Sequence, residues 1–267
     1  MPVIEILGFA ASILIGVSLG LIGGGGSILT VPVLVYMIHI DPVLATAYSL
    51  FVVGSTALVG SVNFLRKGLV SLKTAVIFAV PSFISVFVTR KFVIPAIPDP
   101  VFSLGEFPVT KDLAIMVLFA VIMLVAAWSM IRDKKENKTI EEELSFNYPM
   151  IALEGLVVGV LTGLVGAGGG FLIIPALVLL AHIPMKLAVG TSLLIIAAKS
   201  LIGFTGDLGT QPIDWSFMLI FTSLSIGGLF LGEYLSRFIS GAALKKGFGY
   251  FVLVMAVFIL TKELIFS

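Results

Sequence analysis

The chain has 267 residues, of which 59% are hydrophobic and only 12% are charged, and its net charge is +1. Soluble domains carry about 25% charged residues, so a soluble core of this size cannot hide so much apolar surface. The small net charge excludes a global attraction to nucleic acid, and the absence of cysteine excludes disulfides and thiolate chemistry. The composition therefore predicts a protein whose solvent is the lipid bilayer.

Hydrophobic runs predict five helical segments in each half of the chain. They are residues 3–22, 27–38, 42–65, 72–92 and 112–131 in the first half, and 148–165, 170–181, 185–204, 215–238 and 242–266 in the second. The second segment of each half has about twelve residues, whereas a full crossing needs about 20. We therefore expect each half to begin with a helical hairpin whose turn lies inside the membrane. Irregular backbone at that depth is tolerated only where it is buried in protein or lines a watery cavity.

The segment 16–60 recurs at 159–203 without a gap, with nineteen identities in forty-five positions. Each copy holds a glycine tract, GGGGS at 23–27 and GAGGG at 166–170, followed by an apolar run with one proline. Because each half has an odd number of segments, the second half must enter the membrane upside down. The sequence predicts an all-α fold of two inverted-topology repeats, 1–131 and 148–267, joined by a charged linker at 132–147, with the hairpins meeting near the midplane.

The basic residues of the loops predict the orientation. The loops at 65–73, 132–147, 182–186 and 237–246 hold eleven lysines and arginines, and the opposite loops hold four. The positive-inside rule places the first set in the cytoplasm and both termini outside.

The glycines allow two interpretations. A glycine-broken helix bares backbone N–H groups and points the positive end of the next helix at the cavity, which makes an anion site without a fixed charge. Alternatively, small residues let membrane helices approach closely. We assign Gly16, Gly20, Gly159 and Gly163 to packing and the later tracts to the site. The tract residues assigned to substrate binding are Gly23, Gly24, Gly25, Gly26, Ser27, Gly166, Gly168, Gly169 and Gly170.

A polar stripe follows in the third segment of each copy, with Ser49, Thr56 and Asn63 seven residues apart on one helix face. Lys199, the second-copy counterpart of Thr56, lies inside the apolar run 193–204. An intramembrane cation is costly and is by default a functional hypothesis: it binds an anion, or it releases a proton when the site is empty. A structural ion pair or snorkelling is the alternative. The polar residues assigned to substrate binding are Ser49, Thr56, Asn63, Thr191, Ser192 and Lys199.

Other polar residues carry weaker signals. His39 and His182 match across the repeat, but inversion separates them, so we expect hairpin-end anchors and no metal site. Glu154, inside the sixth segment, is either a proton carrier or a hydrated residue near the cytoplasmic interface. Glu233 and Arg237 are four residues apart and predict a stabilising pair on one helix.

The segments 20–32 (GLIGGGGSILTVP) and 163–175 (GLVGAGGGFLIIP) resemble the two signature repeats of the TauE/SafE sulfite exporter family. The resemblance covers essentially the whole chain. It implies a multi-pass secondary transporter of sulfite, a sulfonate or a related anion in a prokaryotic cell (inner) membrane, working by alternating access. The expected partners are the small anion, the lipid bilayer and a coupling ion such as the proton, and no nucleic acid; the oligomeric state stays open.

Three other classes are weighed against this one. An anion channel of the same fold differs in kinetics, because a carrier saturates and shows counterflow. A scaffold without a substrate tolerates loss of Lys199. An intramembrane enzyme is not expected, because the chain has no cysteine, no paired histidines and no acidic dyad in its spans. Accordingly, we expect no catalytic residue and no cofactor.

Overall fold

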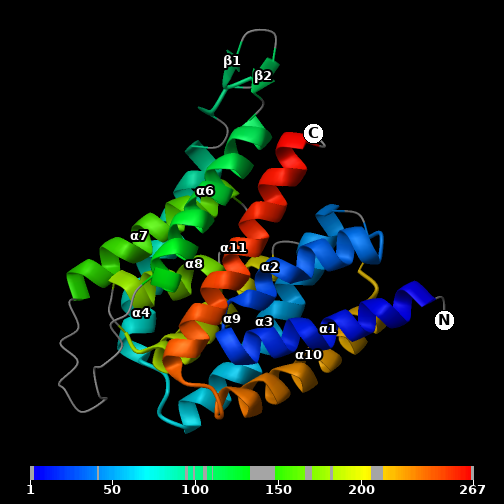
Figure 1. Ribbon diagram of the computed structural model, residues 1–267, viewed down its shortest axis with the longest axis vertical. Helices are drawn as coiled ribbons and strands as arrows, with labels where there is room; N and C mark the ends of the chain where they lie inside the picture. The colour runs from blue at the N-terminus through cyan, green and yellow to red at the C-terminus, as the bar shows by residue number, and fades with distance from the viewer. Residues whose placement is uncertain are drawn as a thin grey trace.

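The computed structural model describes residues 3–40, 42–93, 96–98, 100–104, 107–109, 111–132, 148–165, 170–180, 183–205 and 213–265. Within these residues the protein is almost wholly helical (Figure 1). The long helices are α1 (Val3–Ile22), α3 (Pro42–Arg66), α4 (Leu72–Val88), α6 (Lys111–Arg132), α7 (Tyr148–Val165), α9 (Met185–Thr205), α10 (Trp215–Ser236) and α11 (Gly241–Ile265). These bounds follow the predicted segments closely, so the helical prediction is confirmed.

The second segment of each half is short and changes its geometry at a proline. It consists of α2 (Gly25–Pro32) and the π-helical turn η1 (Val33–Met37) in the first half, and of α8 (Gly170–Pro175) and η3 (Ala176–Leu180) in the second. Proline lacks an N–H and crowds the carbonyl four residues earlier, so the chain widens into a π turn after Pro32 and Pro175. Even with the π turn, each segment is shorter than the about 20 residues of a full crossing.

One small feature departs from the all-helical prediction. The strands β1 (Phe102–Leu104) and β2 (Phe107–Val109) pair antiparallel, with Phe102 opposite Val109. They lie between the π turn η2 (Thr89–Val93) and α6, and Figure 1 shows them as a projection beyond the start of α6. The hairpin leaves the helical core unchanged.

Two pairs of parallel helices are packed backbone to backbone through glycine. In the pair of α1 and α10, a Cβ added at Gly16 would lie 1.8 Å from the carbonyl oxygen of Ser225. In the pair of α4 and α7, a Cβ added at Gly159 would lie 2.4 Å from the carbonyl oxygen of Ser82. Gly20 likewise lies against α10. The predicted close packing is therefore confirmed at Gly16, Gly20 and Gly159.

The helices α3 and α9 form the central pair and run antiparallel. Gly54 lies against Ser200 and Leu201, whereas Gly60, further along α3, lies against Leu193, which is earlier in α9. In the apolar spans of α3 and α9, 56% and 61% of the residues are buried, against 39% in those of α10 and α11. The two helices that correspond in the sequence repeat therefore cross at the centre of the molecule in opposite directions.

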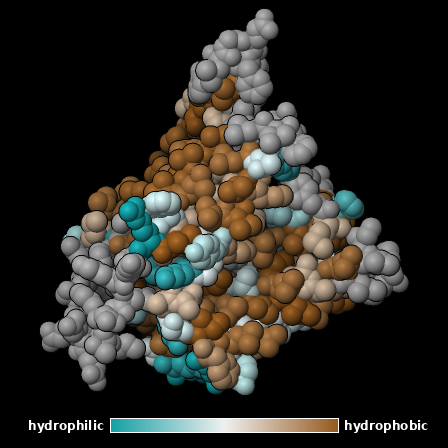
Figure 2. Space-filling model, viewed as in Figure 1, coloured by the Kyte–Doolittle hydropathy of each residue, from teal (hydrophilic) through white to brown (hydrophobic). Residues whose placement is uncertain are grey.

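The outer surface is that of a membrane protein. By length and composition, α3, α9, α10 and α11 can each cross a membrane, and α1, α4, α6 and α7 add shorter apolar helices. Large apolar side chains face outward, and Val125 and Trp128 are each 65% exposed. Figure 2 shows this hydrophobic surface over most of the coloured face. An apolar exterior of this extent requires lipid around it.

The glycine packing predicts different effects for two neighbouring substitutions in α10. A Cβ at Gly228 would lie 2.1 Å from the carbonyl oxygen of Ile13, whereas Gly227 has open space around it. Gly228→Ala forces α1 and α10 apart, and we expect a loss of about 1–3 kcal/mol. Gly227→Ala is the matched control; it introduces a better helix former and leaves stability unchanged or higher. Thermal unfolding in detergent measures both, and equal unfolding temperatures would contradict the packing.

Candidate functional site

The turn between α1 and α2 lies directly against the second half of the chain. Gly23 has a φ of 80°, and its N–H donates to the carbonyl of Leu19 at 2.7 Å. A Cβ added at Gly23 would lie 2.7 Å from the Ser192 hydroxyl oxygen and 3.0 Å from the Val189 carbonyl oxygen. A glycine is required by the backbone angle and by the space. Two residues predicted for the site, Gly23 and Ser192, are therefore neighbours.

The N-cap glycine of α2 and the first glycine of α8 also lie against each other. A Cβ added at Gly24 would lie 2.7 Å from the carbonyl oxygen of Gly170 and 3.1 Å from Cδ1 of Ile174. Gly24 occupies the N-cap position of α2, and no side chain caps this helix. The first N–H groups of a helix have no partner within it, so they are donors for an external acceptor.

The next two glycines have different surroundings. A Cβ at Gly26 would lie 2.4 Å from Cγ of Leu19, so Gly26 lets α2 fold back closely onto α1. A Cβ at Gly25 would make ordinary contacts at 3.4 Å with Ser18 and Phe251. Close packing therefore requires a glycine at position 26 but not at position 25.

Lys199 reaches the end of α7, where the second hairpin begins. Its Nζ donates to the hydroxyl of Thr162 at 3.1 Å, and that hydroxyl donates to the carbonyl of Gly159 at 3.1 Å. Thr162 is 3% exposed and lies in the last turn of α7. Thr162 carries no signal in the sequence repeat, because its first-copy counterpart is the apolar Leu19.

The polar stripe of α3 is buried at its first two positions. Ser49 and Thr56 are 8% and 0% exposed. Within the described part of the chain, the Thr56 hydroxyl oxygen has no hydrogen-bond partner. Buried hydroxyls are normally paired, so this one is a candidate for contact with a ligand. Thr56 lies close to Gly54, where α3 crosses α9 near Ser200.

Asn63 and Thr191 are held at the end of the molecule where α3 passes into α4. The Thr191 hydroxyl accepts from the N–H of Ser71 at 3.0 Å. Asn63 donates from Nδ2 to the carboxylate of Glu233. The side chains of both residues thus have partners outside the hairpin contact.

Glu233 forms a buried ion pair between helices. It is 4% exposed, and its carboxylate accepts from Lys67 as well as from Asn63. The predicted pairing of Glu233 with Arg237 on one helix is therefore wrong. The ion pair joins α10 to α3 instead, a contact between residues far apart in sequence that no local spacing reveals.

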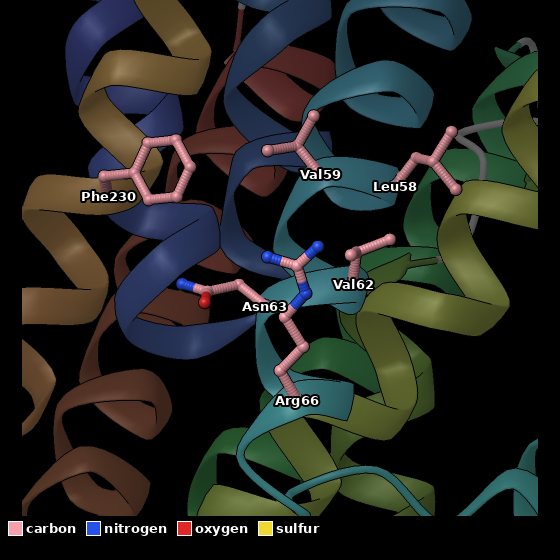
Figure 3. Close-up of a pocket in the computed structure, with 6 residues that line it drawn as sticks. All are labelled: Leu58, Val59, Val62, Asn63, Arg66 and Phe230. Atoms are coloured by element: carbon pink, nitrogen blue, oxygen red, sulfur yellow. The ribbon is translucent and has the colours of Figure 1, made fainter.

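Asn63 also lines a cavity of about 350 Å³ between α3 and α10 (Figure 3). Its other lining residues are Leu58, Val59, Val62, Arg66 and Phe230. Leu58, Val62 and Phe230 are 44%, 42% and 46% exposed, so the cavity lies on the apolar outer surface. None of its lining residues belongs to the hairpins, which separates this cavity from the hairpin contact.

Comparison with known proteins assigns the family. A family model described as sulfite exporter TauE/SafE matches residues 8–259. This chain belongs to that family. A probable membrane transporter protein of Xylella fastidiosa (strain 9a5c) is 28% identical over 255 residues, covering 94% of this chain and 92% of the relative. The probable membrane transporter protein YunE of Bacillus subtilis (strain 168) is 28% identical over 232 residues, covering 81% and 83%. No solved structure matches the chain significantly.

This TauE/SafE family member is accordingly a multi-pass membrane transporter. Several predicted site residues cannot be located: Gly166, Gly168, Gly169 and the side chain of Ser27 lie outside the described residues, as does His182. His39 is exposed and has a φ of 61°. Across the residues that are described, no group of three or more histidine, aspartate or glutamate side chains is arranged to hold a metal ion.

The ion pair predicts a stability difference between neighbouring lysine and arginine substitutions at the end of α3. Lys67→Ala removes one of the partners of the buried Glu233 carboxylate, and an unsatisfied buried acceptor costs about 1–3 kcal/mol. Arg66→Ala is the matched control, because Arg66 is exposed and the described ion pair involves Lys67. Thermal unfolding in detergent compares them; a larger loss for Arg66→Ala would overturn the assignment.

The hairpin turn predicts a second comparison, between two glycines with a positive φ. Gly23 and Gly68 have φ values of 80° and 68°, but only Gly23 is surrounded by other atoms. Alanine at Gly68 costs about 1–2 kcal/mol from the left-handed backbone alone. Alanine at Gly23 adds a clash with α9, worth about another 1–3 kcal/mol. Equal losses of stability in the two variants would show that the turn does not lie against α9.

Proposed function

We propose that this transporter is a secondary carrier that moves a small sulfur-containing oxyanion, sulfite or a sulfonate, by alternating access. The observation that carries the proposal is the contact of the two hairpins, Gly24 against Gly170, with Lys199 bonded to Thr162 at the end of α7. The description of the family supports sulfite as the first anion to test.

Two inverted-topology repeats, residues 1–131 and 148–267 joined by the linker 132–147, explain how the hairpins come to meet. The antiparallel crossing of α3 and α9 supports this arrangement. The contact of Leu50 with Gly203 has its counterpart in the contact of Leu193 with Gly60, as a two-fold axis in the membrane plane requires. The pair of α1 and α10 likewise has its counterpart in the pair of α7 and α4.

The anion binds between the hairpins. Backbone N–H groups within residues 23–27 and 166–170 attract it, helped by the positive ends of the helices that follow. Gly23 contributes the turn rather than a donor, because its N–H is bonded to the carbonyl of Leu19. Lys199 supplies the positive charge. Ser49 and Thr56 supply hydroxyl donors, and the unpaired hydroxyl of Thr56 supports this role. The hydroxyl of Ser192 now donates to the carbonyl of Val189 at 2.8 Å and turns to the anion when it binds.

Asn63 and Thr191 contact the anion only in a second conformation of the carrier. Both are now bound, Asn63 to Glu233 and Thr191 to Ser71. Alternating access requires a conformation in which the site opens to the other side of the membrane. Release of these two side chains in that conformation makes them available to the anion.

The charged loops at 65–73, 132–147 and 237–246 face the cytoplasm of a cell (inner) membrane, with both termini outside. The ion pair of Lys67 and Glu233 supports part of this orientation, because it holds the last turns of α3 and α10 at the same end of the molecule. Figure 1 shows the connections that follow these two helices together at that end.

The test is uptake of labelled sulfite into liposomes that hold the purified protein, with sulfate, thiosulfate and small sulfonates as competitors. Wild type takes up one of these anions saturably and exchanges it in counterflow. Lys199→Ala reduces uptake about 10–100-fold, because a charge-assisted hydrogen bond is worth about 1.5–3 kcal/mol. Lys199→Arg retains part of the activity. Lys246→Ala, an exposed lysine at the start of α11, is the matched control.

Each other outcome is informative. If no sulfur anion moves with folded protein, the proposed substrate is wrong. Flux that neither saturates nor shows counterflow identifies an anion channel of the same fold. Equal uptake by wild type and Lys199→Ala removes Lys199 from the binding site.

A further inference from the structure

Glu154 is a buried carboxyl group within the apolar helix α7. It lies in α7 and is 3% exposed, and neither of its carboxylate oxygens has a hydrogen-bond partner among the described residues. The neighbouring Leu153 and Val157 are 55% and 47% exposed, so Glu154 is on the inner face of a helix whose other face meets lipid. The oxygens of Glu154 are therefore shielded from solvent in this conformation, which favours the proton carrier over the hydrated residue.

The burial of Glu154 bears on whether its carboxyl group is ionised. An ionised carboxylate removed from water costs far more than a protonated one unless a cation or several donors compensate it. Glu233 shows the compensated case, because it is equally buried but accepts from Lys67 and Asn63. Among the described residues Glu154 has no such donors, so its burial favours the protonated form here.

The elements packed against α7 bring few charges to it. From α4 comes Lys73, whose Nζ lies 4.1 Å from the centroid of the Tyr148 ring, and from α6 comes Arg132, which lies over Trp128. The elements α8 and η3 carry no titratable side chain. The side chains of Arg90 and Lys91 in η2 and of Lys111 and Asp112 in α6 lie outside the described residues.

The side chain of Lys199 also reaches α7, and it links Glu154 to the proposed anion site. Glu154, Val158 and Thr162 are four residues apart, all are buried, and they form one stripe along the inner face of α7. Thr162 accepts the hydrogen bond of Lys199. At 1.5 Å per residue, Glu154 and Thr162 are about 12 Å apart along the helix.

We propose that Glu154 is the proton-binding site of this transporter and that the proton is carried together with the anion. This inference rests on the proposed function and adds the coupling ion to it. In the buried conformation described here Glu154 holds its proton. In a conformation that opens this end of α7 to water, the carboxyl group is hydrated and releases it.

Lys199 makes the binding of proton and anion cooperative. With the anion site empty, the positive charge of Lys199 favours the ionised form of Glu154. A bound anion neutralises that charge. At about 12 Å and an effective dielectric constant of about 20, one unit charge changes a proton equilibrium by roughly tenfold. The loaded carrier therefore retains its proton, which is the requirement for symport.

The experiment compares exchange with net transport in proteoliposomes, using sulfite and the competing sulfur anions as probes. Wild type accumulates the anion inside when the interior is alkaline and the exterior acidic. Glu154→Gln, which resembles the protonated acid but cannot release a proton, retains exchange at equal pH within about twofold and loses gradient-driven accumulation at least tenfold. Glu154→Asp retains both activities.

The matched control is Asp214→Asn, which makes the same carboxyl-to-amide change at the exposed N-cap of α10, where asparagine also caps a helix. This variant accumulates the anion as wild type does. If Glu154→Gln also accumulates the anion like wild type, Glu154 is not the coupling site, and the carrier itself stands. If wild type shows no exchange, the proposed function fails instead.

A second readout needs no substrate. Infrared spectroscopy of the purified protein detects the carbonyl stretch of a buried, protonated carboxylic acid. We expect such a band at neutral pH in wild type and in Asp214→Asn, and its loss in Glu154→Gln. The same band in Glu154→Gln would overturn the assignment, whichever anion is carried.

Discussion

A break in the backbone of a membrane helix needs other parts of the protein to cover it, and most of this architecture follows from that need. The backbone turns away from α1 at Gly23, whose N–H still bonds to the carbonyl of Leu19 but whose φ is 80°. Lipid offers no partner for the exposed amides. Here α9 covers the turn at Ser192, and the second short helix covers it at Gly170. The backbone turn that opens the first hairpin is therefore covered by residues of the second half.

Much of the fold could be predicted because its determinants are local. The apolar runs end at charged residues, which mark the ends of the helices. Pro32 and Pro175 mark the places where the short helices pass into π turns. The spacing of Gly16 and Gly20 correctly indicated a packing face. The strands β1 and β2 were missed because three-residue strands are too short to show an alternating pattern.

The candidate site was predictable only in part, because it depends on contacts between distant residues. The glycine tracts and Ser192 were found from the repeat, and Gly23 does lie against Ser192. Thr162 and the pairing of Glu233 with Lys67 were missed. The bond from Lys199 to Thr162 joins residues that are 37 positions apart, and the Lys67–Glu233 pair spans 166 positions, so neither leaves a periodic signal.

The helices α1 and α4 each pack against a helix of the other half, α10 and α7, and this affects how the chain assembles. The glycine face of α1 is synthesised first, but its partner Gly228 follows more than two hundred residues later. The helix α4 must likewise wait for α7. Neither half of the gene product is a complete folding unit, since each leaves its tightest backbone interface unoccupied. Assembly within the membrane must therefore finish late, after the last helices have been inserted.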